Sequence, residues 1–139
     1  MITKILICAA LLAATTAQAQ IGTRFPSERK VVKDPVTGTM LTFLTSQPRG
    51  DSKIYPTHPQ WTSDGQWLVF RSNRVKGEAM AVNEATGDLV QVSEGGYMGM
   101  LNLARKSMKL YFMRADGDSK RVQIVEVDLA KLKKPSWCT

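Results

Sequence analysis

Short apolar runs separated by polar turn residues recur along most of the chain. Residues 67–70 (WLVF), 79–82 (AMAV) and 89–92 (LVQV) have the length of strands, and residues 109–112 (KLYF) and 124–127 (IVEV) have the same character. Runs this short, bounded by Gly, Asp and Ser, are typical of β-strands. Beyond the N-terminal end, no stretch shows a capped helical period. The pattern therefore predicts an all-β protein.

The apolar runs repeat with a period in the low forties. Residues 61–70 align with 103–112 at an offset of 42, and residues 79–83 align with 124–128 at an offset of 45. The three extra residues fall in the loop around residues 116–118. Such a period, built of short strands and turns, is typical of β-propeller blades. Four aromatic residues at inner-strand positions are expected to form the core between blades: Trp61, Trp67, Phe70 and Phe112.

The repeat predicts a β-propeller fragment of roughly two four-stranded antiparallel blades. The second blade has only three predicted strands, within residues 98–128, and residues 128–134 are predicted to be a strand end and a frayed tail. Because propellers protect their strand edges by closing a ring of about four to eight blades, we expect a piece of a longer protein. Self-association of several copies into a ring is the alternative. The predicted parts are a signal peptide (1–19), a lead-in with one outer strand in 39–45 (20–45), a complete first blade (46–93) and an incomplete second blade with a tail (94–139).

The N-terminal end has the layout of a secretory signal peptide. Lys4 precedes an apolar run over residues 5–14, and Ala17 and Ala19 form a small-x-small cleavage site. The apolar run is shorter than the roughly 20 residues that a membrane-spanning helix needs. We therefore expect a periplasmic or secreted protein that has no membrane association after cleavage.

The charge and the cysteine content of the chain exclude some classes of partner and of site. The chain has 19 Lys and Arg against 12 Asp and Glu, which gives a formal net charge of +7. Export and the scattered placement of the basic residues argue against a nucleic-acid partner, so the charge could serve an anionic glycan or solubility alone. Without the signal peptide only Cys138 remains, so the mature chain has no disulfide framework and no zinc-type cysteine spacing.

Residues 59–74 (PQWTSDGQWLVFRSNR) resemble the WD-like blade repeat of the periplasmic Tol-type propellers. Ahead of that blade, residues 25–28 (FPSE), 34–38 (DPVTG) and 41–46 (LTFLTS) look like the start of the oligogalacturonate lyase family. This second resemblance covers roughly residues 24–114. It implies descent from seven-bladed propellers that cleave short pectin fragments by β-elimination with a bound divalent cation, manganese.

The resemblance also implies that this chain lacks the catalytic machinery. The family's metal-binding His and Gln and its catalytic Arg belong to later blades, and no position here matches them. We therefore assign no catalytic or metal-binding residue and no cofactor to this chain, and we expect it to be inactive alone. Its expected partner is an acidic oligosaccharide, oligogalacturonate. The alternative is a non-catalytic Tol-like periplasmic propeller that binds protein or glycan, and the oligomeric state is left open.

Candidate ligand-binding residues lie in loops on one face of the predicted blades. An acidic sugar oligomer needs Arg or Lys opposite its carboxylates and aromatic rings under its sugar faces. These side chains could equally be solvated loop residues. The candidates are Lys53, Tyr55, His58, Arg74 and Arg114, and the same loops also contain Lys76, Tyr97 and Lys120.

The sole histidine and two acidic turns are further candidates for a catalytic or metal-binding role. His58 is a general-base or metal-ligand type of residue, but it precedes Pro59 at the predicted start of an inner strand, which favours a structural role. The sequence around Asp64 lacks the further acidic positions of a calcium loop and predicts a hairpin turn. Asp116 and Asp118 flank a glycine and form a better cation candidate, although a surface turn explains them as well.

Overall fold

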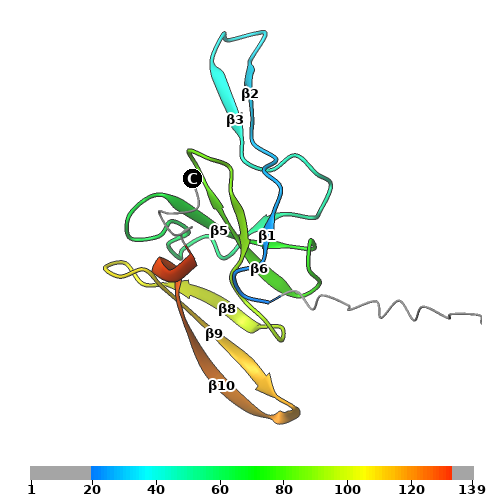
Figure 1. Cartoon of the computed structure of the whole chain (residues 1–139), viewed down its shortest axis with the longest axis vertical. Helices are drawn as coiled ribbons and strands as arrows, with labels where there is room; N and C mark the ends of the chain where they lie inside the picture. The colour runs from blue at the N-terminus through cyan, green and yellow to red at the C-terminus, as the bar shows by residue number, and fades with distance from the viewer. Residues whose placement is uncertain (1–19, 133–139) are drawn as a thin grey trace, which may run out of the picture.

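The computed structural model of the chain describes residues 20–132. Within this range two antiparallel sheets pack against each other, and a two-stranded hairpin projects from one end (Figure 1). The prediction of an all-β propeller fragment is confirmed. No helix in the described part of the chain is long and apolar enough to cross a membrane. The predicted signal peptide at residues 1–19 lies outside the described residues.

The first sheet, blade 1, contains four strands in sequence order and a fifth at its outer edge. The order in space is β1-β7-β6-β5-β4, and all neighbours are antiparallel. The strands are β1 (Arg24–Phe25), β4 (Ser52–Lys53), β5 (Trp67–Ser72), β6 (Glu78–Asn83) and β7 (Leu89–Gln91). The lead-in segment, residues 20–45, therefore supplies an extra outer strand, β1, to this blade.

The innermost strand of blade 1 begins earlier than the sequence predicted and is interrupted. Ser52 and Lys53 pair with Arg71 and Phe70, whereas the next contact with β5 is a single bridge from Trp61 to Leu68. Residues 54–59 between them leave the ladder. Pro56 and Pro59 explain this interruption, because proline has no N–H to donate to a strand pair. His58 therefore lies in an inner loop instead of at the start of a strand.

The turn that leads into β5 has the predicted chemistry. Asp64 accepts hydrogen bonds from the Thr62 hydroxyl at 2.6 Å and from the Gln66 N–H at 3.1 Å. The Trp67 N–H donates to the Thr62 hydroxyl at 3.1 Å. Gly65 has a φ of 69°, in the left-handed region that other residues avoid. These contacts explain Asp64 as a turn residue.

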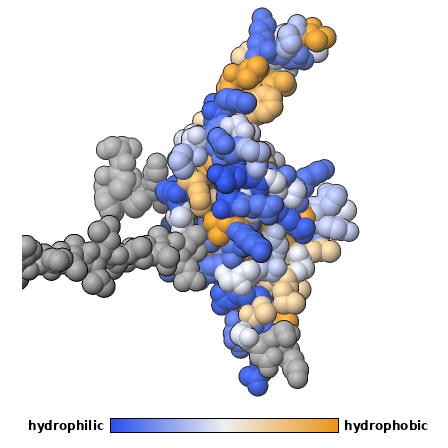
Figure 2. Space-filling view, turned by 90° about the vertical axis from the view of Figure 1, so that its right-hand side faces the viewer, coloured by the Kyte–Doolittle hydropathy of each residue, from blue (hydrophilic) through white to orange (hydrophobic). Residues whose placement is uncertain are grey.

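The projecting hairpin consists of β2 (Lys30–Lys33) and β3 (Met40–Phe43), paired only with each other in the described structure. The strand predicted within residues 39–45 exists as β3, but its partner is β2 and not a blade strand. The four residues of β2, two lysines around two valines, are too short a run to predict a strand, and their pairing depends on the contact with β3. All eight residues of the hairpin strands are exposed, and Figure 2 shows apolar side chains gathered along it.

The second sheet, blade 2, has the three predicted strands and an unpredicted short helix. The strands are β8 (Met98–Leu103), β9 (Lys109–Asp116) and β10 (Asp118–Asp128), in the order β10-β9-β8. A 3-10 helix, η1 (Leu129–Leu132), follows where a strand end and frayed tail were predicted. Leu129 is buried and its N–H donates to the Met108 carbonyl at 2.7 Å. This anchoring holds the segment against blade 2.

The core between the blades follows from the alternation of side chains along each strand. Trp67 and Val69 of blade 1 share one buried cluster with Leu110 and Phe112 of blade 2. Burial of such side chains contributes roughly 1.5–3 kcal/mol each. Trp61, which the sequence placed in this core, is 42% exposed. It lies at the interrupted inner edge, where only one bridge holds it.

The two outward faces of this two-blade stack differ. On blade 1, Phe70, Met80 and Val82 form a second buried cluster, covered by Phe25 and Leu44 of the lead-in segment. Phe70 thus contributes to a core on the side of blade 1 turned away from blade 2. The corresponding outward face of blade 2 has no such cover within the described residues, and the large side chains at its open surface are Met98, Met100, Met113, Val122 and Ile124.

Candidate functional site

Arg74 is held in a buried ion-pair cluster. Its Nε and Nη2 donate to the two carboxylate oxygens of Glu28 at 3.1 and 2.6 Å. Its Nη1 forms a short ion pair with Asp51 and donates to the Ser72 hydroxyl at 2.7 Å. The Arg74 side chain is only 3% exposed. The guanidinium of this candidate ligand-binding residue is thus engaged by three partners within the protein, and it joins the lead-in segment to blade 1.

The same cluster shifts the ionisation of its members. Burial raises the pKa of Glu28, but the hydrogen bonds from Arg74 and from the Ser46 and Gln47 N–H groups outweigh it and leave this pKa below its ordinary value. For Arg74, burial alone lowers the pKa, and the contacts with Glu28 and Asp51 raise it overall. Both groups are therefore charged over the physiological range, and the cluster is a fixed structural clamp.

Arg71, three residues earlier on β5, was not among the predicted site residues. It lies between Ser52 of β4 and Ala79 of β6, and its guanidinium carbon is 6.0 Å from the centre of the Tyr97 ring. Its guanidinium has no hydrogen bond or ion pair with residues 20–132, and its Nε is buried without a partner. Arg71 directly follows the apolar run 67–70, so the sequence places it in a strand and not in a ligand-binding loop.

The loop that carries Tyr97 is fixed by buried polar contacts. Glu78 accepts a hydrogen bond from the Ser93 hydroxyl at 2.6 Å and from the Gly96 N–H at 2.7 Å. The Ser93 hydroxyl in turn accepts from the Ala79 N–H at 2.8 Å. Burial raises the pKa of Tyr97, Arg71 opposes this, and Glu78 adds to it. Tyr97 is thus a neutral, half-buried ring at the junction of the two blades.

Tyr55 and His58 are brought together in the inner loop of blade 1. Their ring centres are 5.1 Å apart in an edge-to-face arrangement. The backbone N–H of His58 donates to the backbone carbonyl of Tyr55 at 3.1 Å. The His58 Nδ1 is buried and has no hydrogen-bond partner among the described residues. The two predicted residues thus form one local unit at the inner edge of the sheet.

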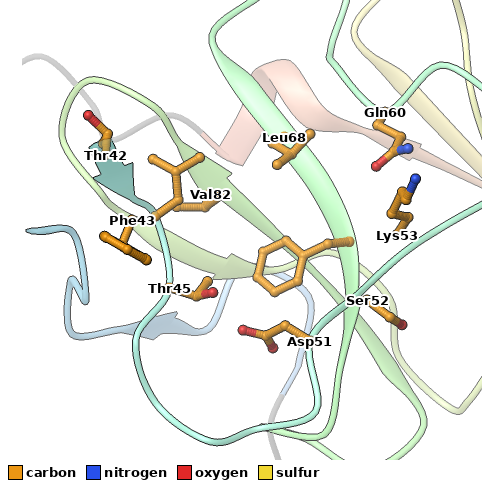
Figure 3. A pocket seen from close by; sticks show the side chains of 11 residues that line it. Thr42, Phe43, Thr45, Asp51, Ser52, Lys53, Gln60, Leu68 and Val82 are labelled. Atoms are coloured by element: carbon orange, nitrogen blue, oxygen red, sulfur yellow. The ribbon is translucent and has the colours of Figure 1, made fainter. Parts of the chain in front are cut away.

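Lys53 lies in a groove on the outward face of blade 1. Because Lys53 pairs with Phe70 on the neighbouring strand, their side chains share the face turned away from blade 2. The groove has a volume of about 420 Å³, with Phe43, Phe70 and Leu68 among its apolar lining residues. Figure 3 shows Lys53 and Gln60 close together at one side of it. Lys53 and Arg71 therefore face opposite sides of the same sheet.

Arg114 extends from β9 toward the loop between the blades. Its Nη1 donates to the Glu94 carbonyl at 3.5 Å and its Nη2 to the Gln123 side chain at 3.4 Å, both of them long hydrogen bonds. Lys76 is exposed in the turn before β6. The side chain of Lys120 is outside the described part of the structure. Asp116 is exposed at the turn between β9 and β10.

The structure therefore distributes the predicted site residues over several separate locations. Tyr55 and His58 meet, Lys53 lies in its own groove, and Arg74 is part of the clamp. Arg114 and Tyr97 lie near the junction of the blades, where Arg71 joins them. Within residues 20–132, no group of three or more His, Cys, Asp or Glu side chains is arranged to hold a metal ion.

Solved structures that share this fold include two oligogalacturonate lyases. An oligogalacturonate lyase in complex with manganese has a TM-score of 0.64 and 22% identity, over 83% of this chain and 30% of that chain. An oligogalacturonate lyase from Vibrio parahaemolyticus has a TM-score of 0.64 and 19% identity, over 82% of this chain and 30% of that chain. The chain therefore spans about 30% of the length of these lyases. No protein-family model and no curated protein matches the sequence.

Proposed function

We propose that this chain is part of a larger exported β-propeller that binds acidic pectin oligosaccharides of the oligogalacturonate class. The observation that carries the proposal is the shared fold: more than four fifths of the chain superposes on two oligogalacturonate lyases. A basic chain with arginine and tyrosine at the junction of its blades suits such a ligand, because guanidinium groups bind carboxylates and aromatic rings pack on sugars.

The outward face of blade 2, which no described residue covers, is evidence that the chain belongs to a larger propeller. By the repeat offset, Tyr111 and Met113 of β9 occupy the positions that Val69 and Arg71 hold in β5. In blade 1 this face packs against blade 2. In blade 2 no described residue covers this face, which has a groove of about 490 Å³ that Met100, Met113 and Ile124 help to line. We infer that its occupant is a further propeller blade, with apolar side chains at the positions of Leu110 and Phe112.

We propose that the chain contributes binding and not β-elimination. One lyase that shares its fold is a manganese complex, but the residues described here offer no matching metal-binding group. His58, the sole histidine, has its Nδ1 enclosed in the inner loop. These residues therefore do not fit the metal, and we derive no catalytic step from it.

Calorimetric titration of the chain without residues 1–19 tests the proposal. Trigalacturonate should bind, and the uncharged galactose trimer should bind at least about tenfold more weakly, as expected when a charge-assisted hydrogen bond is lost. Equal affinity for both sugars would refute recognition of the acidic groups. Binding of neither would refute glycan recognition and favour a propeller with a protein partner.

The proposed lack of catalysis has a separate assay. The same protein is incubated with trigalacturonate and manganese, and the absorbance of the unsaturated product is followed. No increase above a protein-free control is expected. Manganese-dependent turnover would show that the catalytic groups are present after all.

A further inference from the structure

We propose that Arg71 and Tyr97 form a carboxylate subsite at the junction of the two blades, with a uronate carboxylate as the ligand. This inference rests on the proposed function, because it names the part of the chain that would recognise the acidic sugar. Arg71 provides the positive charge, and Tyr97 positions it.

The fold places both residues at one end of the contact between the blades. Arg71 follows Trp67 and Val69 at alternate positions along β5, so all three side chains share the face that packs on blade 2. Tyr97 immediately precedes β8 of blade 2 and packs against the same core cluster. The pair therefore joins the two blades where the loop after β7 enters blade 2.

The charge on Arg71 is not neutralised within the described structure. Its guanidinium makes no hydrogen bond or ion pair with residues 20–132. Glu78, which interacts electrostatically with Tyr97, directs its two carboxylate oxygens to the Ser93 hydroxyl and the Gly96 N–H instead. Arg74, in contrast, has two carboxylate partners. Arg71 is thus a partly buried cation without a counterion.

The guanidinium nitrogens of Arg71 differ in their burial. Its Nε is buried without a partner. Nη1 and Nη2 also have no partner among the described residues, but they are not fully buried. These two nitrogens are therefore open to a ligand. The two N–H groups that these nitrogens present side by side match the two oxygens of a carboxylate.

Tyr97 holds the guanidinium in place before the ligand binds. An arginine within about 6 Å of an aromatic ring centre is attracted to the ring face, and the separation here is 6.0 Å. The ring itself is held because Glu78 fixes the adjacent Gly96 N–H. A group that is ordered in advance loses less conformational freedom on binding. Tyr97 is therefore a positioning residue, and its ring matters more than its hydroxyl.

The direct test is an NMR titration of the chain from residue 20 onward, with ¹⁵N-labelled arginine and galacturonic acid as the probe. The Arg71 Nε–Hε signal, assigned by its loss in Arg71→Met, should shift and saturate with galacturonic acid and stay unchanged with galactose. No shift of this signal, or equal shifts with both sugars, would overturn the subsite.

Variants test the roles of the two residues in trigalacturonate binding. Arg71→Met should weaken binding about tenfold or more, and Arg71→Lys should restore only part of it, because lysine has no planar pair of donors. Tyr97→Phe should bind as the unmodified chain does, whereas Tyr97→Leu should lose affinity. Arg105→Met, a change at an exposed arginine of blade 2, is the matched control and should have no effect.

The results separate this inference from the proposed function. If the chain prefers trigalacturonate but Arg71→Met binds it equally well, the subsite is wrong and the proposed function stands. If Arg71 responds to galacturonic acid but the chain does not prefer trigalacturonate, the subsite stands and the proposed function falls. Should Arg71→Met fail to fold by circular dichroism, the loss of the signal in Arg71→Lys assigns it instead, and the titration of the unmodified chain still decides.

Discussion

The guanidinium of Arg74 and the carboxylate of Glu28 face each other through two hydrogen bonds, 3.1 and 2.6 Å long, although 46 residues separate them in the sequence. Asp51 forms a second ion pair with the same guanidinium. The cluster attaches the lead-in segment to the first blade. Its removal should therefore destabilise the fold itself.

Replacement of Arg74 by Met should lower the free energy of unfolding by about 3–5 kcal/mol, because it leaves two carboxylates without their cation. Urea denaturation monitored by tryptophan fluorescence measures this change. Arg105→Met serves as the control and should stay within about 0.5 kcal/mol of the unmodified chain. A loss for Arg74→Met as small as that of the control would mean that the ion pairs do not hold the lead-in segment.

The cluster should also make stability depend on pH. The pKa of Glu28 is lower in the folded chain than its ordinary value, so the unfolded chain binds the proton more readily. The contribution of Glu28 is then fully present above about pH 4.3, the value for an unperturbed glutamate, and is lost as the pH falls through the folded pKa. Urea denaturation at pH 6, 4 and 3 should show the difference between the unmodified chain and Glu28→Gln shrinking on acidification. A difference that is constant with pH would contradict this role.

Two glycines with similar backbone conformations should respond differently to alanine. Gly65 and Gly87 have φ values of 69° and 74°, so each substitution introduces left-handed strain of roughly 1–2 kcal/mol. A side chain at Gly65 meets no atom within 4 Å, whereas one at Gly87 collides with Ser27 and Arg29 of the lead-in segment. Thermal unfolding should therefore show a larger loss for Gly87→Ala, by about 1 kcal/mol or more. Equal losses would show that the lead-in segment does not pack on this turn.

The outward face of blade 2, which no described residue covers, should promote association. Met113 is 42% and Ile124 is 80% exposed, and apolar sheet faces of this kind associate with other chains. In sedimentation velocity, the double variant Met113→Glu, Ile124→Glu should associate less than the unmodified chain at the same concentration. Val36→Glu, at a position 90% exposed in the hairpin turn, is the control and should not change association. The same behaviour in both variants would contradict an open interblade face.

The blades could be predicted from the sequence because their signal is local and repeated. The strands around Trp67 and Lys109 follow from the same short pattern of apolar residues. The charged clamp could not be predicted, because Glu28 and Asp51 lie 46 and 23 positions from Arg74 and no local pattern connects them. Only the fold brings Glu28 and Asp51 to Arg74 and leaves Arg71 without an ion-pair partner among the described residues. The pairing of β3 with β2 and the exposure of Trp61 likewise depend on contacts that no local pattern specifies.

The most direct test of the central claim compares trigalacturonate with its fully methyl-esterified form by calorimetry. The two sugars have the same rings and linkages and differ in the charge of their carboxyl groups. A propeller piece that recognises uronate carboxylates should bind the free acid at least about tenfold more tightly, and added salt should weaken that binding. Equal affinity for the ester and the acid would contradict the claim.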